Sequence, residues 1–412
     1  MTGSQEFFTL KPVQEALERL FAEIAPARAT ETIPTYEALG RVLASAPISP
    51  IDLPAFDRSA MDGYAVRANN TFGASDALPA YLHVIGQVHM GEVPMLTLGE
   101  GQAVEIHTGA MIPEGADAVV MIERTQALDG SEIEVLAPVA QGENIIRTGE
   151  DIRAGSEALS PGHVIRPQDI GGLLAVGITE VSVVKRPLIG VLSGGDELVD
   201  AHETPAHGQI RDINSPMLMA LCQQAGADTV FLGIARDKFD SLYTMARDGH
   251  AQCDLLVLSA GSSVSVRDLT GEVIDRLGAP GIIQHGIAVK PGKPTLIASC
   301  DGKAVIGLPG NPVSAMLVAR QVLLPIIRHW FGQDDPLPMT LSATLTENIA
   351  STTGREDSVP VCLHHTADGY QAEPIRGKSN LIYTLLRADG LLHIPLNVSG
   401  YRAGATVEVL AF

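Results

Sequence analysis

Between residues 186 and 331, short apolar runs alternate with segments whose apolar residues recur at helical spacing. The last repeat is the clearest. An apolar, partly β-branched run at 303–308 leads through Pro309 and Gly310 into a helical pattern that begins at Pro312. This alternation predicts a mostly parallel sheet with helices on both faces. Ligands of such folds bind at the carboxyl ends of the strands, so we expect functional residues just after each strand.

The flanking regions carry other patterns. Residues 9–24 place apolar side chains on one stripe of a predicted amphipathic helix. From 80 to 146 the chain shows short alternating or β-branched runs separated by Gly, Pro and Asp, which predicts a small all-β unit. Mixed strand and helix patterns follow it, so we expect an inserted domain. Beyond Gly332, short β runs with Gly turns predict a small barrel-like unit.

The turn at 307–311 leads into a helix N-terminus, where free N–H groups and the positive dipole end favour an anion. We expect Asn311 to cap this helix and Pro312 to occupy its first position. Pro325 should kink or end the helix. Most helix starts of this kind bind nothing, so the turn by itself is weak evidence for a site.

Two other predicted strands end in polar loops. One is followed by Ser193, two glycines and the adjacent acids Asp196 and Glu197. The other is followed by a hydroxyl-rich loop, 259–268, that ends in Asp268. None of these loops matches the Walker or dinucleotide fingerprint, which disfavours ordinary P-loop and NAD chemistry. Such loops are common as plain turns, but three of them at one sheet edge together indicate a ligand site.

Composition narrows the kind of ligand. Forty-eight acids against 28 bases give a formal charge of −20, which argues against nucleic acid or an anionic membrane as a partner. Lys290 and Lys293 flank a Pro-Gly turn, which is either an exposed hairpin or a phosphate contact. The four cysteines form no C-x-x-C pair, and the sequence carries no signal-peptide or membrane-span pattern, so we expect a cytoplasmic protein.

Taken together, eight stretches of this chain resemble the molybdopterin molybdenumtransferase family, whose bacterial members are called MoeA and whose animal relative is the C-terminal part of gephyrin. The first and the last of them are long and highly specific. They are LPAFDRSAMDGYA (53–65), HTGAMIPEGADAVV (107–120), GENIIRTGEDIRAG (142–155), LSGGDEL (192–198), GQIRDINSPML (208–218), SAGSSVSVRDL (259–269), VKPGKP (289–294) and GLPGNPVSA (307–315).

The resemblance implies a multidomain α/β and β protein that forms a homodimer. It implies an elongated dimerisation domain split between residues 1–52 and 150–185, and an inserted β domain at 53–149. It further implies an α/β molybdopterin-binding domain with a mostly parallel sheet at 186–332, and a C-terminal β barrel at 333–412.

The implied activity is insertion of molybdate into adenylylated molybdopterin, which releases AMP. Cleavage of an anionic phosphoanhydride needs charge neutralisation, which Mg²⁺ held by carboxylates would supply. The family also implies transient contact with the adenylyltransferase that makes the substrate and with molybdoenzyme chaperones.

By resemblance we assign site residues in three groups. The catalytic candidates are Asp62, Asp151, Glu197 and Asp268. The metal-ligand candidates are Asp62, Asp196, Glu197 and Asp268. The substrate-binding candidates are Thr108, Ser193, Asp196, Gly261, Ser262, Ser263, Lys290, Lys293, Pro309, Gly310 and Asn311.

Two departures from the family pattern leave alternatives open. Gly194 stands where the family often has Thr, and the loop from Ala260 to Arg267 replaces two glycines and a valine. These changes leave the choice between molybdate and tungstate undecided. They also keep open a non-catalytic role in pterin binding or scaffolding, although no extra scaffold domain is present in this sequence. The related adenylyltransferase step is disfavoured, because it uses a similar α/β part alone.

Overall fold

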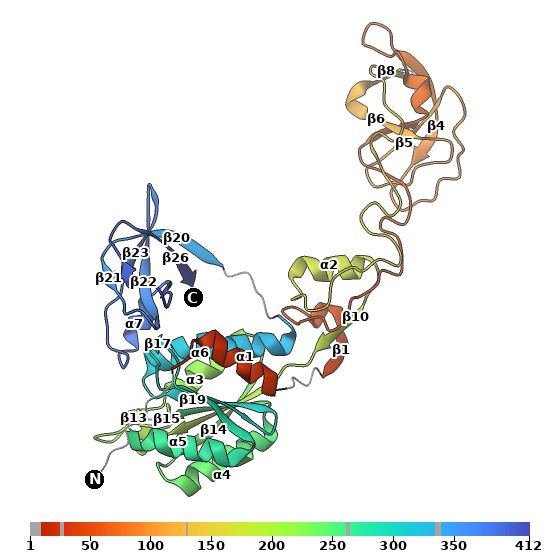
Figure 1. Ribbon diagram of the computed structural model, residues 1–412. Helices are drawn as coiled ribbons and strands as arrows, with labels where there is room; N and C mark the ends of the chain where they lie inside the picture. The colour runs from red at the N-terminus through yellow and green to blue at the C-terminus, as the bar shows by residue number, and fades with distance from the viewer. Residues whose placement is uncertain (1–9, 25–28, 129–130, 261–263, 334–338) are drawn as a thin grey trace, which may run out of the picture. The chain divides into compact units, whose positions relative to one another are not determined.

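The computed structural model describes residues 10–24, 29–128, 131–260, 264–333 and 339–412 (Figure 1). The chain forms two compact units. One contains the described residues up to Thr30 together with those from Val184 onward, and the other is Glu31–Val183.

A six-stranded sheet forms the centre of the first unit. Its strands, in spatial order, are β14 (Asp228–Ala235), β11 (Leu188–Gly194), β15 (Leu255–Ala260), β19 (Lys303–Pro309), β18 (Leu296–Cys300) and β16 (Pro280–His285). The first four run parallel, and β18 and β16 pair antiparallel at one edge. β15 is buried along its whole length, as its apolar run at 255–258 predicts.

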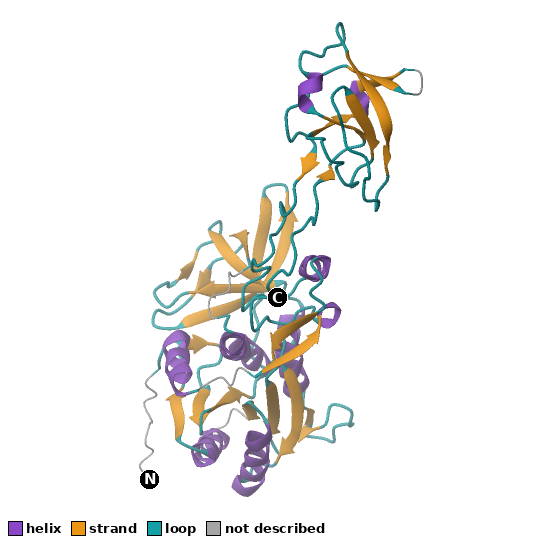
Figure 2. Cartoon of the chain, turned by 90° about the vertical axis from the view of Figure 1, so that its right-hand side faces the viewer, coloured by secondary structure: helices purple, strands orange, loops and turns teal. Residues whose placement is uncertain are grey.

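Helices cover both faces of this sheet (Figure 2). α3 (Asn214–Gln224) packs with α6 (Pro312–Phe331), and α4 (Phe239–Gln252) packs with α5 (Val264–Leu277). α1 (Val13–Glu23) buries its apolar stripe against β18, β16 and α6. The predicted α/β arrangement is confirmed. α1 thus clusters with the α/β part, whereas the sequence analysis grouped it with the split dimerisation domain, whose boundaries stay a prediction.

The C-terminal part is a closed barrel of five strands. They are β22 (Glu356–Thr366), β23 (Gly369–Pro374), β20 (Thr340–Leu345), β26 (Thr406–Ala411) and β24 (Gly390–Ile394), and the pairing of β24 with β22 closes the ring. Its smaller elements are β21 (Ile349–Ala350), α7 (Tyr383–Leu386) and β25 (Gly400–Tyr401). β17 (Val289–Lys290), from the α/β part, pairs with β22 and joins the two parts.

The second unit begins and ends in paired strands, β1 (Thr30–Pro34) and β10 (Glu180–Val184), beside α2 (Pro167–Ala175) and the 3₁₀ helix η1 (Thr35–Glu37). β2 (Arg58–Ser59) and β9 (Ile145–Ile146) also pair, so the two flanks of the inserted β part lie side by side.

The inserted part is itself a six-stranded sheet. Its strands, in spatial order, are β6 (Ala118–Met121), β3 (Gly63–Val66), β5 (Gln102–Ile106), β4 (Ala80–Val88), β8 (Glu132–Val135) and β7 (Thr125–Ala127). The remaining short elements are η2 (Ala68–Thr71), η3 (Ile122–Arg124), β12 (Leu198–Val199) and β13 (Ile210–Arg211). The predicted inserted β unit is confirmed.

One local expectation is wrong in part. α6 continues six residues past Pro325, so that proline does not end the helix. The tertiary packing of α6 outweighs the lost hydrogen bond, since α6 buries eight residues before Pro325 and three after it. None of the helices in the described part of the chain combines the length and apolarity needed to cross a bilayer.

Candidate functional site

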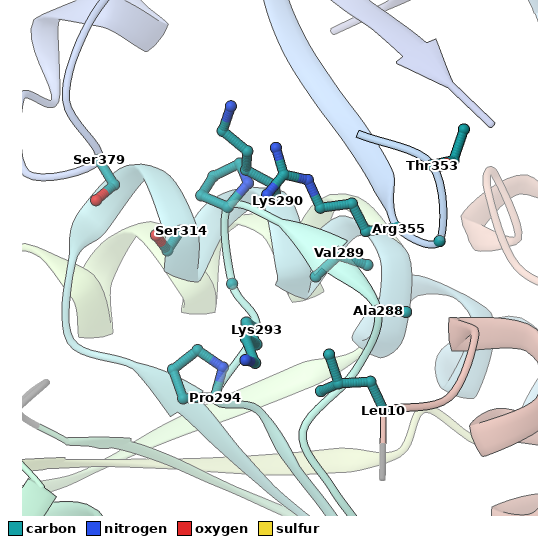
Figure 3. Close-up of a pocket in the computed structure, with 13 residues that line it drawn as sticks. Leu10, Ala288, Val289, Lys290, Lys293, Pro294, Ser314, Thr353, Arg355 and Ser379 are labelled. Carbon is teal, nitrogen blue, oxygen red and sulfur yellow. The ribbon is translucent and has the colours of Figure 1, made fainter. Parts of the chain in front are cut away.

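A pocket of about 390 Å³ opens where the α/β part meets the C-terminal barrel. Its polar lining is three cationic side chains, Lys290, Lys293 and Arg355, and three hydroxyl side chains, Ser314, Thr353 and Ser379 (Figure 3). These residues come from the end of β17 and the turn after it, the start of α6 and two loops of the C-terminal part. A concave surface with this lining suits a small polyatomic anion, which Arg can bind with its planar fork and Lys as a point charge.

A buried carboxylate fixes two of these cations. The pairing of β17 with β22 sets Lys290 opposite Asp357. The Asp357 carboxylate is only 4% exposed. It accepts a hydrogen bond from Arg355 Nε at 2.9 Å and lies 3.7 Å from Lys290 Nζ. One carboxylate therefore orients two cations, and the pocket retains a surplus of positive charge for an anion.

Asn311 takes a different role from the expected one. It stands at the N-cap position of α6, but its side chain makes no capping hydrogen bond. Its Nδ2 instead donates to Ser379 Oγ at 3.2 Å, while the Ser379 carbonyl accepts from the Val313 N–H at 3.1 Å. The expectation that Asn311 caps the helix is therefore wrong. The side chain and the helix start together tie a barrel loop to the pocket wall.

The second group of candidate residues lies at the strand ends. Ser193, the next-to-last residue of β11, is fully buried, with its hydroxyl 2.8 Å from Ser215 Oγ. Asp196 and Glu197 follow in an exposed turn, and Arg236 Nη1 lies 3.9 Å from Asp196 Oδ1. The structure thus brings the two acids to the edge where they were predicted, while a direct substrate contact by Ser193 stays a prediction.

Asp237 also lies at this edge, although it is not among the residues predicted from sequence. It follows β14, and its N–H donates to Asp196 Oδ1 at 3.4 Å. Partial burial, and then the negative charges of Asp196 and Glu197, raise the pKa of the Asp237 carboxyl. The signal that would have found it was available, because Asp237 comes just after the predicted strand at 228–235.

These carboxylates bear on the Mg²⁺ expectation. Among the described residues, no three His, Cys, Asp or Glu side chains cluster so as to hold a metal ion by themselves. Mg²⁺, however, usually takes one or two protein carboxylates and fills its other positions with water and substrate phosphates. Asp196 and Glu197 are exposed carboxylates of the kind that such a site uses, and Asp237 lies beside them.

The remaining strand-end candidates are placed only in part. Pro309 ends β19 and is buried, and Gly310 is half-buried in the turn that follows. Asp268 is exposed in the second turn of α5. The predictions for Gly261, Ser262 and Ser263 lie outside the described residues.

Two candidate acids belong to the unit Glu31–Val183. Asp62 accepts hydrogen bonds at its Oδ1 from the Thr108 N–H at 2.7 Å and the Thr108 hydroxyl at 3.1 Å, with His107 Nδ1 3.8 Å away. These two hydrogen bonds, and then His107, hold the pKa of Asp62 below its ordinary value. Thr108 is therefore a direct hydrogen-bond donor to Asp62. Asp151 is exposed, and its N–H donates to the Leu53 carbonyl at 3.0 Å.

Known proteins match the chain over nearly its whole length. Three sequence-family models match the chain in succession: the MoeA N-terminal region (domain I and II) over residues 11–177, a probable molybdopterin binding domain over 190–329, and the MoeA C-terminal region (domain IV) over 342–412. The molybdopterin molybdenumtransferase of Bacillus subtilis is 34% identical over 403 residues, 97% of this chain and 93% of its own length. The chain belongs to the molybdopterin molybdenumtransferase family.

Other members of the molybdopterin molybdenumtransferase family agree over the full length. Molybdopterin molybdenumtransferase 2 of Mycobacterium tuberculosis is 34% identical over 97% of this chain and 99% of its own. The crystal structure of the molybdopterin biosynthesis moeA protein from Pyrococcus horikoshii OT3 superposes with a TM-score of 0.85 at 31% identity, covering 98% of this chain and 100% of that one. The multidomain fold predicted for the family is confirmed.

Proposed function

We propose that this chain inserts molybdenum into adenylylated molybdopterin, using molybdate and releasing AMP. Its membership of the molybdopterin molybdenumtransferase family makes it an enzyme of molybdenum cofactor biosynthesis. The observation that supports the finer proposal most directly is the pocket of Lys290, Lys293 and Arg355, which offers cations and hydroxyl groups to an oxyanion in an otherwise acidic chain. We therefore assign molybdate, as substrate, to this pocket.

The pterin nucleotide is proposed to lie at the strand ends of the α/β part. In this proposal the turn at Pro309 and Gly310 approaches its phosphates with backbone groups, and Ser193 contributes to the shape of the same edge. Among the carboxylates, Asp62, Asp151, Glu197 and Asp268 are the proposed catalytic groups. They orient the phosphoanhydride and hold or move the proton of the attacking oxygen.

Mg²⁺ is proposed as the cofactor, held by Asp196 and Glu197, with Asp237 beside them and Asp62 and Asp268 as further candidates. When bound, it would neutralise the charge that develops on the phosphate oxygens as the phosphoanhydride breaks. The residues named here would supply the oxygen ligands, and the nucleotide would supply the rest.

A homodimer is proposed as the working form. Within the unit Glu31–Val183, several large apolar side chains are exposed, which is a feature of surfaces that meet a partner. They include Tyr36, Leu39, Ile48, Ile51 and Leu174, at 41–68% exposure. In this proposal a second copy covers them, and Asp62 and Asp151 of one copy complete the site of the other.

The cellular setting is also a proposal. The four cysteines are free thiols, and Cys222, Cys253 and Cys300 are buried, which fits a reducing cytoplasm. The adenylyltransferase and molybdoenzyme chaperones are proposed as transient partners, with no role for nucleic acid or a membrane.

The decisive experiment incubates the chain with adenylylated molybdopterin, Mg²⁺ and molybdate and measures AMP. We expect molybdate-dependent AMP release that falls at least 100-fold in Asp62→Ala and Asp268→Ala variants. Absence of AMP release with tight pterin binding would favour the pterin-binding or scaffolding alternative. Replacing molybdate by tungstate in the same assay measures the oxyanion preference, and faster release with tungstate would reassign the substrate.

A further inference from the structure

The side-chain amide of Asn214, at the start of α3, joins two strand ends of the parallel sheet. Its Nδ2 donates to Ser259 Oγ on β15 at 3.0 Å and to the carbonyl oxygen of Gly310, just after β19, at 2.9 Å. Asn214 and Ser259 are buried, at 8% and 3% exposure. One amide group thus spans the ends of adjacent strands whose following turns carry candidate substrate contacts.

The backbone around Asn214 is fixed as well. Asp212, which is buried, accepts hydrogen bonds at Oδ1 from the N–H groups of Asn214 and Ser215, each at 3.1 Å. The Ser215 hydroxyl meets that of Ser193 at the end of β11. We name Asp212, Asn214 and Ser215 the strand-end clamp, because together they contact the carboxyl ends of three parallel strands.

The hydrogen bonds also fix which way the amide of Asn214 points. A carbonyl oxygen can only accept, so the nitrogen of the amide must face Gly310, and Oδ1 must face the other way. That Oδ1 is buried, and no hydrogen-bond partner for it occurs in the described part of the chain. Burying an amide oxygen without a hydrogen-bond partner lowers the stability of the fold. Stability alone therefore does not explain why an amide occupies this position.

We propose that Asn214 is a positioning residue for the pterin nucleotide: its amide sets the spacing between the end of β15 and the Gly310 turn. This inference rests on the proposed function. β15 and β19 pair as far as Ala260 and Pro309, and Gly310 lies one residue beyond that pairing. Without the two hydrogen bonds, the Gly310 turn would be free to shift relative to the end of β15 before the nucleotide binds. Preformed contacts lower the ordering cost of binding, and displacements of about 1 Å at such contacts cost up to about 100-fold in rate or affinity.

The test compares two matched amide-to-carboxylate changes on α3. Asn214→Asp keeps the shape of the side chain but replaces the donating nitrogen by an acceptor, which opposes the Gly310 carbonyl. Gln223→Glu makes the same change at the other end of the helix, where Nε2 of Gln223 donates to Thr229 Oγ1 at 2.8 Å. We expect Asn214→Asp to raise KM for adenylylated molybdopterin about tenfold, with kcat changed less than threefold, and Gln223→Glu to leave both unchanged.

The split between KM and kcat separates positioning from mere structural damage. A variant that only unfolds a fraction of the molecules lowers the apparent kcat and leaves KM alone, so that result would overturn the proposal. Ser259→Ala removes one of the two bonds without adding a charge and is expected to raise the same KM about threefold. If Asn214→Asp fails to fold, the KM of Ser259→Ala becomes the test. An unchanged KM in Ser259→Ala would then refute the positioning role of Asn214.

Equilibrium binding of adenylylated molybdopterin keeps this test independent of the proposed function. If the wild-type chain releases no AMP, the proposed function fails, and the dissociation constant then replaces KM as the measured quantity. A tenfold larger dissociation constant for Asn214→Asp, with that of Gln223→Glu unchanged, would still support the positioning role. Equal affinity for adenylylated molybdopterin in the wild type and all variants would refute the positioning role of Asn214, whether or not the wild type is active.

Discussion

At the scale of single residues, Asp357 orients two of the three cations in the pocket of Lys290, Lys293 and Arg355. This carboxylate is buried, and Arg355 and Lys290 reach it from two different parts of the fold. Burial of an unpaired carboxylate would be costly, so the two cations stabilise Asp357 as much as Asp357 orients them. Because both cations remain partly exposed, they keep donors available for an anion.

Arg355 supplies the first prediction. Replacing Arg355 with Gln removes a charge-assisted donor from the pocket, and we expect KM for molybdate to rise about tenfold or more, with KM for the pterin nucleotide changed much less. Arg402→Gln is the matched control, since Arg402 is an exposed barrel residue away from the pocket lining. Steady-state AMP release at varied molybdate measures both. Equal KM values for the two variants would place molybdate elsewhere.

The second prediction concerns Thr108. Its hydroxyl and N–H both stabilise ionised Asp62, so the pKa of Asp62 lies below the ordinary value. Thr108→Val removes the hydroxyl bond and keeps the N–H bond, so the pKa should rise part of the way back. A depressed pKa keeps Asp62 ionised to lower pH, and the variant should therefore lose activity at a higher pH on the acid side.

The measurement for Thr108 is carboxyl NMR titration of Asp62 together with the pH profile of AMP release. Thr125→Val is the control, because the Thr125 hydroxyl donates to the Ile122 carbonyl and to no carboxylate in the described hydrogen bonds. An unmoved Asp62 titration in Thr108→Val would contradict the role given to the hydroxyl.

At the scale of elements, α2 shows how one acid stabilises a helix start. Asp169 is 7% exposed and accepts hydrogen bonds from the Arg166 N–H at 2.8 Å and the Arg166 guanidinium at 3.0 Å, with His163 Nε2 at 2.6 Å. The bonds from Arg166, followed by those from His163, hold the pKa of Asp169 far below its ordinary value. The capping bonds between Arg166 and Asp169 and the fixed φ of Pro167 both favour a helix start at Pro167.

Asp169→Asn should lower the free energy of unfolding by about 1–2 kcal/mol at neutral pH. The folded-state pKa is depressed, so this stabilisation is present above the unfolded pKa of about 3.9 and is lost as the pH falls below it. The loss is complete only below the depressed folded pKa, so the difference in stability between the wild type and the variant should narrow steadily toward pH 2. Urea unfolding at several pH values measures this, with Asp248→Asn, at an exposed position of α4, as the control. A gap that stays constant down to pH 2 would exclude the ionised carboxylate as its source.

At the scale of the whole molecule, the candidate acids are divided between two compact units. Asp62 and Asp151 lie in Glu31–Val183, and Asp196, Glu197 and Asp268 lie in the other unit. A shared site between two copies of the chain makes a specific prediction for mixed dimers. A heterodimer of Asp62→Ala and Asp268→Ala subunits would contain one site with both acids intact and one site with neither.

Co-expression of these two variants should therefore restore about a quarter of wild-type AMP release, since half of randomly formed dimers are mixed and each has one intact site. Each variant alone should be inactive. A site completed within one subunit would give no recovery, and size-exclusion chromatography would show whether dimers are present. Dimers without recovery would place all the acids of a site in the same copy.

Residue patterns along the chain were sufficient to predict the main parts of the fold. Strand and helix alternation gave the parallel sheet, short β runs gave the inserted part and the barrel, and the strand-end rule located Asp196 and Glu197. The same rule, applied to β14, would have located Asp237. These features follow from local periodicity and from the position of a residue relative to its own strand, which the order of amino acids contains.

Tertiary structure alone decided the composition of the pocket and of the clamp. Arg355, Asp357 and Ser379 lie in barrel segments with no distinguishing local pattern, and they reach Lys290 only because β17 pairs with β22. Asn311 looked like a helix cap and instead contacts Ser379 across the same junction. Contacts between residues tens of positions apart depend on how separate elements pack, and hydrophobic periodicity within each element carries no information about its partner.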